Sequence, residues 1–491
     1  MVLLCRLTTP VNFRVIFRKR FLRLYASPNL DFNSRSGSEF EIGALVDKIG
    51  GLNDELEVFQ SLVQSPGSET VQFNDSLVSS LLNRFQDDWK SALGVFRWIE
   101  SCSLCKPNPL LYNELLDILG KARQMEKMKN LLAEMHKDRI VSLDTIAKAM
   151  RRFAGSRDWR SAVELFDDLE SYGLARNTES MNILLDTLCK EQRVFRARSI
   201  FLRLKPHIPP NANTFNILIH GWCKANRVEE AVWTVEEMKG HGFRPCIITH
   251  STIIRFHCRT RNFGKVFEAL EEMKSEGCAP NVVTFTIIMD SLAKSGNLEE
   301  ALQVPEKMNG CKPDTRFYNV LIHTLGRAGK VDEAVAVLEK EMPLNGVRPS
   351  TSTYNTVISI LCHHRQEKRA LEYLEESGEE WKPDLQSFHP LFKSCFRCEM
   401  GFRILSRLLK DAVEKHNLCL DLGSFTLLIH GFCRRGQCEL AYELFREMVG
   451  RNLVPRYKTC SLLLHEIREK CMYDAADMVE DFMNKMKSIH R

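Results

Sequence analysis

Residues 213–224 read Asn-Thr-Phe-Asn-Ile-Leu-Ile-His-Gly-Trp-Cys-Lys, and residues 352–363 read Ser-Thr-Tyr-Asn-Thr-Val-Ile-Ser-Ile-Leu-Cys-His. Similar segments recur along the chain about every 35 residues, and a fixed period of this size is typical of repeat architectures. Eleven copies begin at residues 109, 143, 178, 212, 247, 282, 315, 351, 385, 422 and 457. A degenerate copy at 73–108 precedes them.

Each copy has the apolar pattern of two short helices. Counted from the first residue of a copy, positions 4, 7, 8 and 11 are apolar in nearly all copies, and this is the spacing of one buried helix face. A second amphipathic segment follows, such as 228–238, with acidic residues at its start and Gly and Pro after its end. Two such helices cannot bury their apolar faces alone, but stacked pairs can. The sequence therefore predicts an all-α fold, an α-solenoid of about eleven to twelve 35-residue helix-turn-helix repeats.

Small residues at two positions support this register. Position 20 is Ala in most copies, which leaves room for close packing of the second helix on the first. Position 12 is Cys in five copies, and we interpret these thiols as small packing residues rather than redox groups. One copy departs from the pattern, because Pro305 occupies position 24 and is expected to kink its second helix.

The N-terminus differs from the repeats in charge. Residues 1–30 contain six basic residues and no acidic residue, and their apolar residues fall largely on one helical face. This pattern is typical of an organelle transit peptide, although a disordered basic tail is an alternative. We assign residues 1–25 to a mitochondrial transit peptide, with chloroplast import as the alternative, and residues 26–72 to a linker with a short helical lead-in. The net charge of the whole chain is +5, so the remainder carries −1 and bulk charge indicates no partner.

The residue pattern of the copies resembles that of the pentatricopeptide repeat family, in particular its P class of plant organelles. The resemblance rests on the Tyr/Phe-Asn…Cys-Lys string and the terminal Pro-Asp/Asn, and it covers residues 73–491. It implies a right-handed superhelix and binding of single-stranded RNA, with ten repeats in 109–456 and a C-terminal repeat or cap in 457–491. Tetratricopeptide repeats have a similar period, but their characteristic Trp and Gly-Tyr pattern is missing here.

Position 13 carries a cation in eight of the eleven copies, far more often than the overall Lys and Arg content predicts. Stacking of the repeats aligns these cations in one row, which we call the basic ladder. Such a row matches a phosphate backbone even when the total charge is near zero, and the alternative is a favourable position at a helix C-terminus. The predicted phosphate-binding residues are Lys121, Lys190, Lys224, Arg259, Lys294, Arg327, Arg397 and Arg434.

The resemblance also implies which side chains read bases. It places one pair in each repeat, at position 5 and at the last residue, and about one base is read per repeat. The pairs in this chain are Asn113/Ser142, Ala147/Asn177, Asn182/Asn211, Asn216/Cys246, Ser251/Asn281, Thr286/Asp314, Asn319/Ser350, Asn355/Asp384, His389/Asp421 and Thr426/Arg456.

The resemblance further implies G for Thr286/Asp314, A for Ser251/Asn281, C or U for Asn182/Asn211 and U for Asn355/Asp384. Ala147, Cys246, His389 and Arg456 depart from the usual pairs and leave their bases open. The polarity of position 5 has a structural alternative, since Asn after an aromatic residue can cap a helix. That alternative leaves the last residue of the repeat unexplained.

No catalytic or metal site is evident. No His is followed two residues later by Glu, so the zinc deaminase motif of some relatives is missing. The pairs Cys102/Cys105 and Cys395/Cys398 lie far apart in sequence, so we do not expect them to share a metal, and we expect no cofactor. No apolar run is long enough for a membrane span.

These observations predict a non-enzymatic, sequence-specific adaptor for single-stranded organellar RNA, acting in RNA processing, splicing, stability or translation. Other RNA-processing or ribosomal proteins are candidate partners. The alternative is a helical scaffold that binds proteins, for example at an organelle ribosome.

Overall fold

The computed structural model describes residues 54–64, 75–101, 108–308, 310–377, 381–397, 401–451 and 453–489. All regular elements within these ranges are helices, as the repeat pattern predicts. The expected transit peptide lies outside the described residues, and so do Cys102, Cys105 and Cys398.

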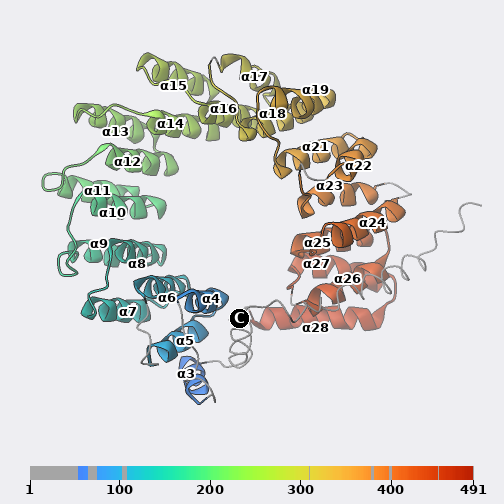
Figure 1. The fold of residues 1–491 in the computed structure, drawn as a ribbon, viewed down its shortest axis with the longest axis horizontal. Helices are drawn as coiled ribbons and strands as arrows, with labels where there is room; N and C mark the ends of the chain where they lie inside the picture. Colours follow the sequence, from blue (N-terminus) through green and yellow to red (C-terminus); the bar gives the residue numbers. More distant parts are fainter. Residues whose placement is uncertain are drawn as a thin grey trace, which may run out of the picture. The chain divides into compact units, whose positions relative to one another are not determined.

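The chain divides into two compact units, with Asp31–Pro280 in one and Asn281–Arg491 in the other. Each unit is a row of helix pairs in which every first helix packs against its own second helix and against the first helix of the next pair. Figure 1 shows this stacking for α6 to α13 in the first unit and for α21 to α28 in the second. Each unit is therefore an α-solenoid.

The first helices begin at the residues from which the sequence register is counted, and most end at position 13. They are α6 (Pro109–Lys121), α8 (Leu143–Gly155), α10 (Thr178–Lys190), α12 (Ala212–Lys224), α14 (Ile247–Arg259), α16 (Val282–Ser295), α18 (Thr315–Arg327), α21 (Thr351–His363), α23 (Leu385–Cys395), α25 (Leu422–Arg434) and α27 (Tyr457–Glu469).

The second helices vary more in length. They are α7 (Met125–Lys137), α9 (Trp159–Asp167), α11 (Val194–Leu204), α13 (Val228–Gly240), α15 (Phe263–Ser275), α17 (Leu298–Leu302), α19 (Val331–Ala336) with α20 (Met342–Leu344), α22 (Glu367–Glu375), α24 (Gly401–Lys410), α26 (Cys438–Gly450) and α28 (Tyr473–Ile489). Before the regular repeats, α4 (Asp75–Arg84) and α5 (Trp89–Ser101) form a further pair, and α3 (Glu55–Val63) packs against α5.

The predicted apolar face forms the core. In α12, Phe215, Leu218 and Ile219 are fully buried and Trp222 is nearly so. The alanines at position 20 are also buried, so each second helix lies close to its first helix, as the pattern predicts. These alanines are Ala162, Ala197, Ala231, Ala301, Ala334, Ala370 and Ala441.

In repeats that are shorter or longer than usual, the second helix is the part that differs in length or form. The repeat at 282–314 is the shortest, and there α17 stops after five residues and a 3-10 turn, Pro305–Lys307, replaces its continuation. The expected disruption at Pro305 is therefore present. The repeats at 315–350 and 385–421 are the longest, and each contains a π-helical turn, Val337–Glu341 or Asp411–Lys415. A π turn accommodates an extra residue without ending the helix.

Neighbouring first helices approach closely where position 12 of one repeat meets position 10 of the next. A Cβ placed on Gly221 would lie 2.5 Å from Cys189 Sγ, and one placed on Gly431 would lie 2.3 Å from the Phe396 ring. In a third contact the glycine is at position 12 instead: Gly326 faces Ile360, which is at position 10 of the next repeat. One member of each of these contacts is small, which explains why Cys suits position 12.

Candidate nucleic-acid interface

The last residue of each repeat is the N-cap of the next first helix. The polar side chains accept a hydrogen bond from the backbone N–H three residues later, which is the usual N-cap arrangement. This holds for Ser142, Asn177, Asn211, Asn281, Asp314, Ser350, Asp384 and Asp421. Capping was our structural alternative for position 5, and that assignment was wrong, because position 5 lies in the second turn of the helix. The polarity of the last residue therefore has a structural cause.

Position 5 contacts the last residue of the same repeat directly in three repeats. Asn182 Nδ2 donates to Asn211 Oδ1 at 3.2 Å, and Asn355 Nδ2 donates to Asp384 Oδ1 at 3.0 Å. A weaker contact, 3.9 Å long, joins Asn216 Nδ2 to Cys246 Sγ. Residues about 30 positions apart in sequence are thus brought together by the fold.

Other predicted pairs are not joined in this way. Asn319 donates to the Ser352 hydroxyl at 2.9 Å rather than to Ser350. Thr286 and Thr426 donate to carbonyl oxygens of their own helices, those of Val282 and Leu422. For Asn113 and Ser142, the structure shows Asn113 almost fully buried and the Ser142 hydroxyl engaged with Thr145. Ser251 and Asn281 belong to different units.

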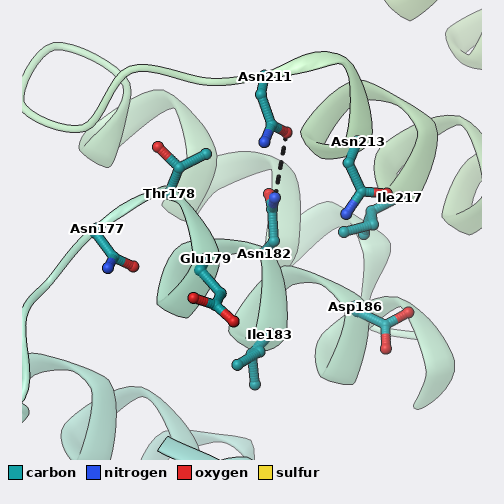
Figure 2. Close-up of a pocket in the computed structure, with 9 residues that line it drawn as sticks. All are labelled: Asn177, Thr178, Glu179, Asn182, Ile183, Asp186, Asn211, Asn213 and Ile217. Atoms are coloured by element: carbon teal, nitrogen blue, oxygen red, sulfur yellow. Dashed lines mark hydrogen bonds between the residues drawn. The ribbon is translucent and has the colours of Figure 1, made fainter.

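The Asn182–Asn211 pair lines an open cleft of about 700 Å³ between α10 and α12 (Figure 2). Two polar atoms of the pair have no hydrogen-bond partner among the described residues. Asn182 Oδ1 is buried and accepts no hydrogen bond within the described part of the chain. Asn211 Nδ2 donates none there, since only its Oδ1 is used for capping and for the pair contact. Sequence reasoning missed the other walls of this cleft, which include Ile183, Ile217 and Asn213.

The Asn355–Asp384 pair leaves a different atom available. Asp384 Oδ1 accepts from the Ser387 backbone N–H, the Ser387 hydroxyl and Asn355 Nδ2. Asp384 Oδ2 accepts no hydrogen bond from a described residue. At the last position, Asn therefore presents a donor and Asp presents an acceptor.

The basic ladder is held by contacts within the protein. Lys121, Lys190 and Lys294 each form an ion pair with the aspartate four residues earlier. Lys224, Arg259 and Arg327 instead donate to backbone carbonyls near the end of the preceding first helix, at Lys190, Cys223 and Ala293. Their stabilising role at helix C-termini is therefore visible. Arg397 and Arg434 are exposed and make no side-chain contact of this kind with a described residue.

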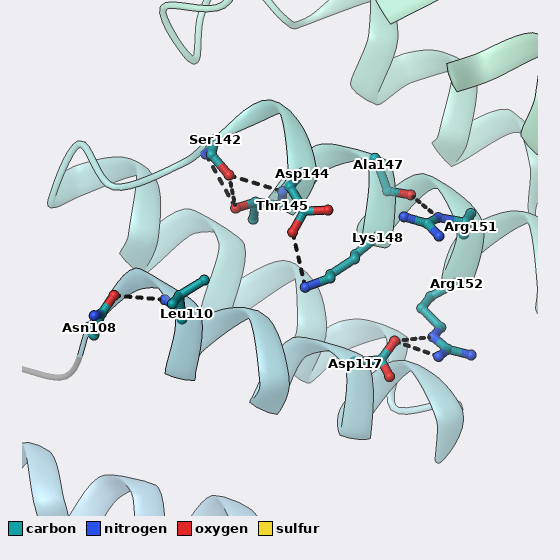
Figure 3. A network of polar contacts seen from close by, with 10 residues as sticks. All are labelled: Asn108, Leu110, Asp117, Ser142, Asp144, Thr145, Ala147, Lys148, Arg151 and Arg152. Carbon is teal, nitrogen blue, oxygen red and sulfur yellow. Dashed lines mark hydrogen bonds and ion pairs between the residues drawn. The ribbon is translucent and has the colours of Figure 1, made fainter. Parts of the chain in front are cut away.

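Cations near the first of these repeats are also neutralised by acids. Figure 3 shows Arg152 paired with Asp117 and Lys148 paired with Asp144, while Arg151 donates to the Ala147 carbonyl. Arg152 and Asp117 come from neighbouring first helices, so this ion pair also connects two repeats. The Arg152 guanidinium holds the pKa of Asp117 below its usual value despite the opposing effect of burial.

Histidines at position 9 lie one turn before the ladder. Burial lowers the pKa of His220, His323 and His430, and the neighbouring position-13 cation lowers each pKa further. These imidazoles are therefore neutral at pH 7. They can exchange hydrogen bonds with a ligand without adding to the positive charge of the ladder.

The thiols differ strongly in their expected reactivity. Burial raises the pKa of Cys189, Cys223, Cys362 and Cys433 to about 12. Cys246 is exposed, and although partial desolvation opposes ionisation, hydrogen bonds from Thr249, Ile248 and Asn216 lower its pKa.

Among the described residues there is no group of three or more His, Cys, Asp or Glu side chains that could hold a metal ion. In the same described part of the chain, no helix is both long enough and apolar enough to cross a membrane.

Alkylation should therefore separate these cysteines. In the folded protein at neutral pH, we expect iodoacetamide to modify Cys246 at least ~10-fold faster than Cys189, because the thiolate is the reactive species. Peptide mass spectrometry over a time course measures both rates, and the urea-unfolded chain, in which the rates should converge, is the control. Equal rates in the folded protein would contradict the burial and hydrogen bonding described for these thiols.

Comparison with known proteins identifies the repeats. Models described as PPR repeat or PPR repeat family match residues 111–140, 210–259, 245–294, 283–311, 313–363, 352–380 and 416–449. A mitochondrial pentatricopeptide repeat-containing protein of Arabidopsis thaliana is 49% identical over 460 residues, which cover 92% of this chain and 90% of that protein. The chain belongs to the pentatricopeptide repeat family.

Further relatives of this pentatricopeptide repeat protein agree in name. A second mitochondrial pentatricopeptide repeat-containing protein of Arabidopsis thaliana is 41% identical, with 90% of this chain and 80% of that protein covered. Among solved structures, the pentatricopeptide repeat protein PPR10 in complex with an 18-nt psaJ RNA element is similar at 18% identity and a TM-score of 0.36. That match covers 97% of this chain and 91% of the other.

Proposed function

We propose that this pentatricopeptide repeat protein is a sequence-specific, non-enzymatic adaptor for single-stranded RNA that acts by occupying a transcript. The observation that carries this proposal is the Asn182–Asn211 pair in its open cleft, where one buried acceptor and one donor lack partners in the described part of the chain. A buried polar atom without a partner is unfavourable, so a ligand that supplies the missing bond is favoured. Unstacked bases of single-stranded RNA offer such groups on their Watson–Crick edges.

The Asn182–Asn211 and Asn355–Asp384 pairs leave different atoms available, and each set suits a different base. The free amide Nδ2 of Asn211 suits the N3 acceptor of cytosine, while Asn182 Oδ1 suits a donor such as the cytosine amino group. The free carboxylate oxygen of Asp384 accepts and cannot donate, so it suits the N3–H of uracil. These chemistries agree with the bases that the family resemblance implies for the two repeats.

The basic ladder supplies the sequence-independent part of binding in this proposal. We expect Lys224→Ala and Lys294→Ala to weaken binding to all RNAs about equally. Each should reduce the slope of log K against log salt concentration by about 0.7, the value for one phosphate contact of a single strand. Fluorescence anisotropy with a random RNA pool at several salt concentrations measures the slope. An unchanged slope in the folded double variant would contradict the phosphate role, whereas a wild-type chain that does not bind RNA would favour a protein-binding scaffold.

We infer a mitochondrial site of action from the names of the two Arabidopsis relatives and the basic N-terminus. A fluorescent reporter fused to residues 1–40 should enter mitochondria. Import into chloroplasts instead would overturn this assignment.

A further inference from the structure

A second cleft, of about 800 Å³, lies between α23 and α25 and is strongly basic. Among the residues that the structure describes, five Lys or Arg residues and two histidines line it, and no Asp or Glu does. The cations are Lys393, Arg397, Arg434, Arg435 and Arg456, and the histidines are His389 and His430. We call this site the α23–α25 pocket.

The cations of this pocket are not neutralised as those near the N-terminal repeats are. Lys393, Arg397, Arg434 and Arg456 are exposed, and none of their side chains forms an ion pair with any residue that the structure describes. By contrast, the cleft near α6 and α8 is lined by Lys121, Lys148, Arg152 and Lys190, and each of these pairs with an aspartate. Like charges that converge without ion-pair partners repel one another, so an anionic ligand would relieve this repulsion.

Local departures from the repeat pattern shape the pocket for such a ligand. Arg456 occupies the last position of its repeat, but its side chain makes no capping bond, unlike the Asn and Asp side chains found at this position elsewhere. Gly423, at position 2, puts no side chain into the cleft, whereas Leu110 and Ile248 project exposed side chains from the same position in their repeats. His389 contacts the Ser424 hydroxyl at 2.8 Å, so its imidazole is fixed on the wall of the pocket rather than paired with Asp421.

We propose that the α23–α25 pocket binds a phosphate group of the RNA, and that these two repeats anchor the strand through charge instead of selecting bases. This inference rests on the proposed RNA-binding function. Arginine forks match the oxygens of a phosphate, and three arginines reach the pocket from different segments, Arg397 after α23, Arg434 at the end of α25 and Arg456 before α27. The phosphate is either an internal phosphodiester or a terminal phosphomonoester, and both offer the same oxygens to these side chains.

The test compares two triple variants with the same change in net charge. The pocket variant carries Arg397→Gln, Arg434→Gln and Arg456→Gln. The control variant carries Lys265→Gln, Lys274→Gln and Lys330→Gln, whose lysines are partly exposed and paired with acids on or beside second helices. With a random RNA pool, we expect the pocket variant to lose one phosphate contact and therefore to reduce the salt slope by about 0.7, while the control leaves the slope nearly unchanged. A third variant with Lys at the three arginine positions should restore most of the slope.

The outcomes separate the possible failures. If the wild-type chain binds RNA and the pocket variant has an unchanged slope, or changes it no more than the control does, the pocket proposal is overturned and the proposed function stands. If the wild-type chain does not bind RNA, the proposed function itself fails. A comparison of three RNAs, with a 5′-phosphate, with a 3′-phosphate and with hydroxyls at both ends, shows whether the bound phosphate is terminal or internal. A terminal phosphate as ligand predicts tighter binding of one phosphorylated RNA by the wild-type chain only, and an internal phosphodiester predicts equal binding of all three.

Discussion

Replacing Asp384 by Asn is expected to change the base preferred by the repeat at 351–384 from U to C. The free Oδ2 of Asp384 accepts from N3–H of uracil, whereas an amide Nδ2 in its place would donate to N3 of cytosine. The expected discrimination is about 1–3 kcal/mol, or roughly 5- to 150-fold in the ratio of dissociation constants. Binding of two RNAs that differ at this one nucleotide measures the change.

Stability should be unaffected by Asp384→Asn, because Asn also caps helices at this position, as Asn211 does for α12. The reciprocal change, Asn211→Asp, should move the repeat at 178–211 from C towards U and leaves the cap in place. This pair of variants controls for general effects of charge on RNA affinity. If both variants lose affinity for every RNA without a change in base preference, the two residues do not read bases.

Gly221→Val is expected to destabilise the chain by about 1–3 kcal/mol, which is the usual effect of overpacking. The added Cβ would lie 2.5 Å from Cys189 Sγ on the neighbouring first helix, and α10 and α12 would have to move apart. The cleft that holds Asn182 and Asn211 lies between these same helices. RNA binding at that repeat should therefore weaken together with stability.

Thermal or urea unfolding of Gly221→Val and wild type measures this effect. Gly240→Val is the matched control, because a Cβ at Gly240 meets no atom of a described residue within 4 Å. A second variant that also carries Cys189→Gly should recover most of the lost stability. Equal unfolding curves for Gly221→Val and Gly240→Val would show that the close contact between repeats does not limit packing.

The sequence alone was enough to predict the helices and their register. The apolar period of positions 4, 7, 8 and 11 is a direct consequence of helix geometry, so Phe215, Leu218, Ile219 and Trp222 could be assigned to the core without coordinates. Pro305 was also informative, since its lack of an N–H disrupts a helix wherever it occurs inside one. The π-helical turns were not predicted, because an added residue in a second helix leaves no local signature.

The candidate site was harder to predict. The last residue of each repeat was assigned to base reading, but its capping role depends on where the next helix begins, which becomes certain only in the structure. Ladder residues such as Lys224 and Lys294 have the same charge and position, yet one contacts a carbonyl and the other an aspartate. The α23–α25 pocket was missed because Lys393 and Arg456 do not occupy position 13, and only folding places them beside Arg434.

Selection of RNA from a random pool by the wild-type chain tests the central claim most directly, because one repeat is expected to specify one nucleotide. The selected RNAs should contain G, from Thr286/Asp314. They should contain U two nucleotides beyond the G, from Asn355/Asp384, and a pyrimidine three nucleotides from the G on the other side, from Asn182/Asn211. Enrichment of these bases at these spacings is the predicted result. Tight binding without enrichment of any base at a fixed position would contradict the account, and so would enrichment of bases at other spacings.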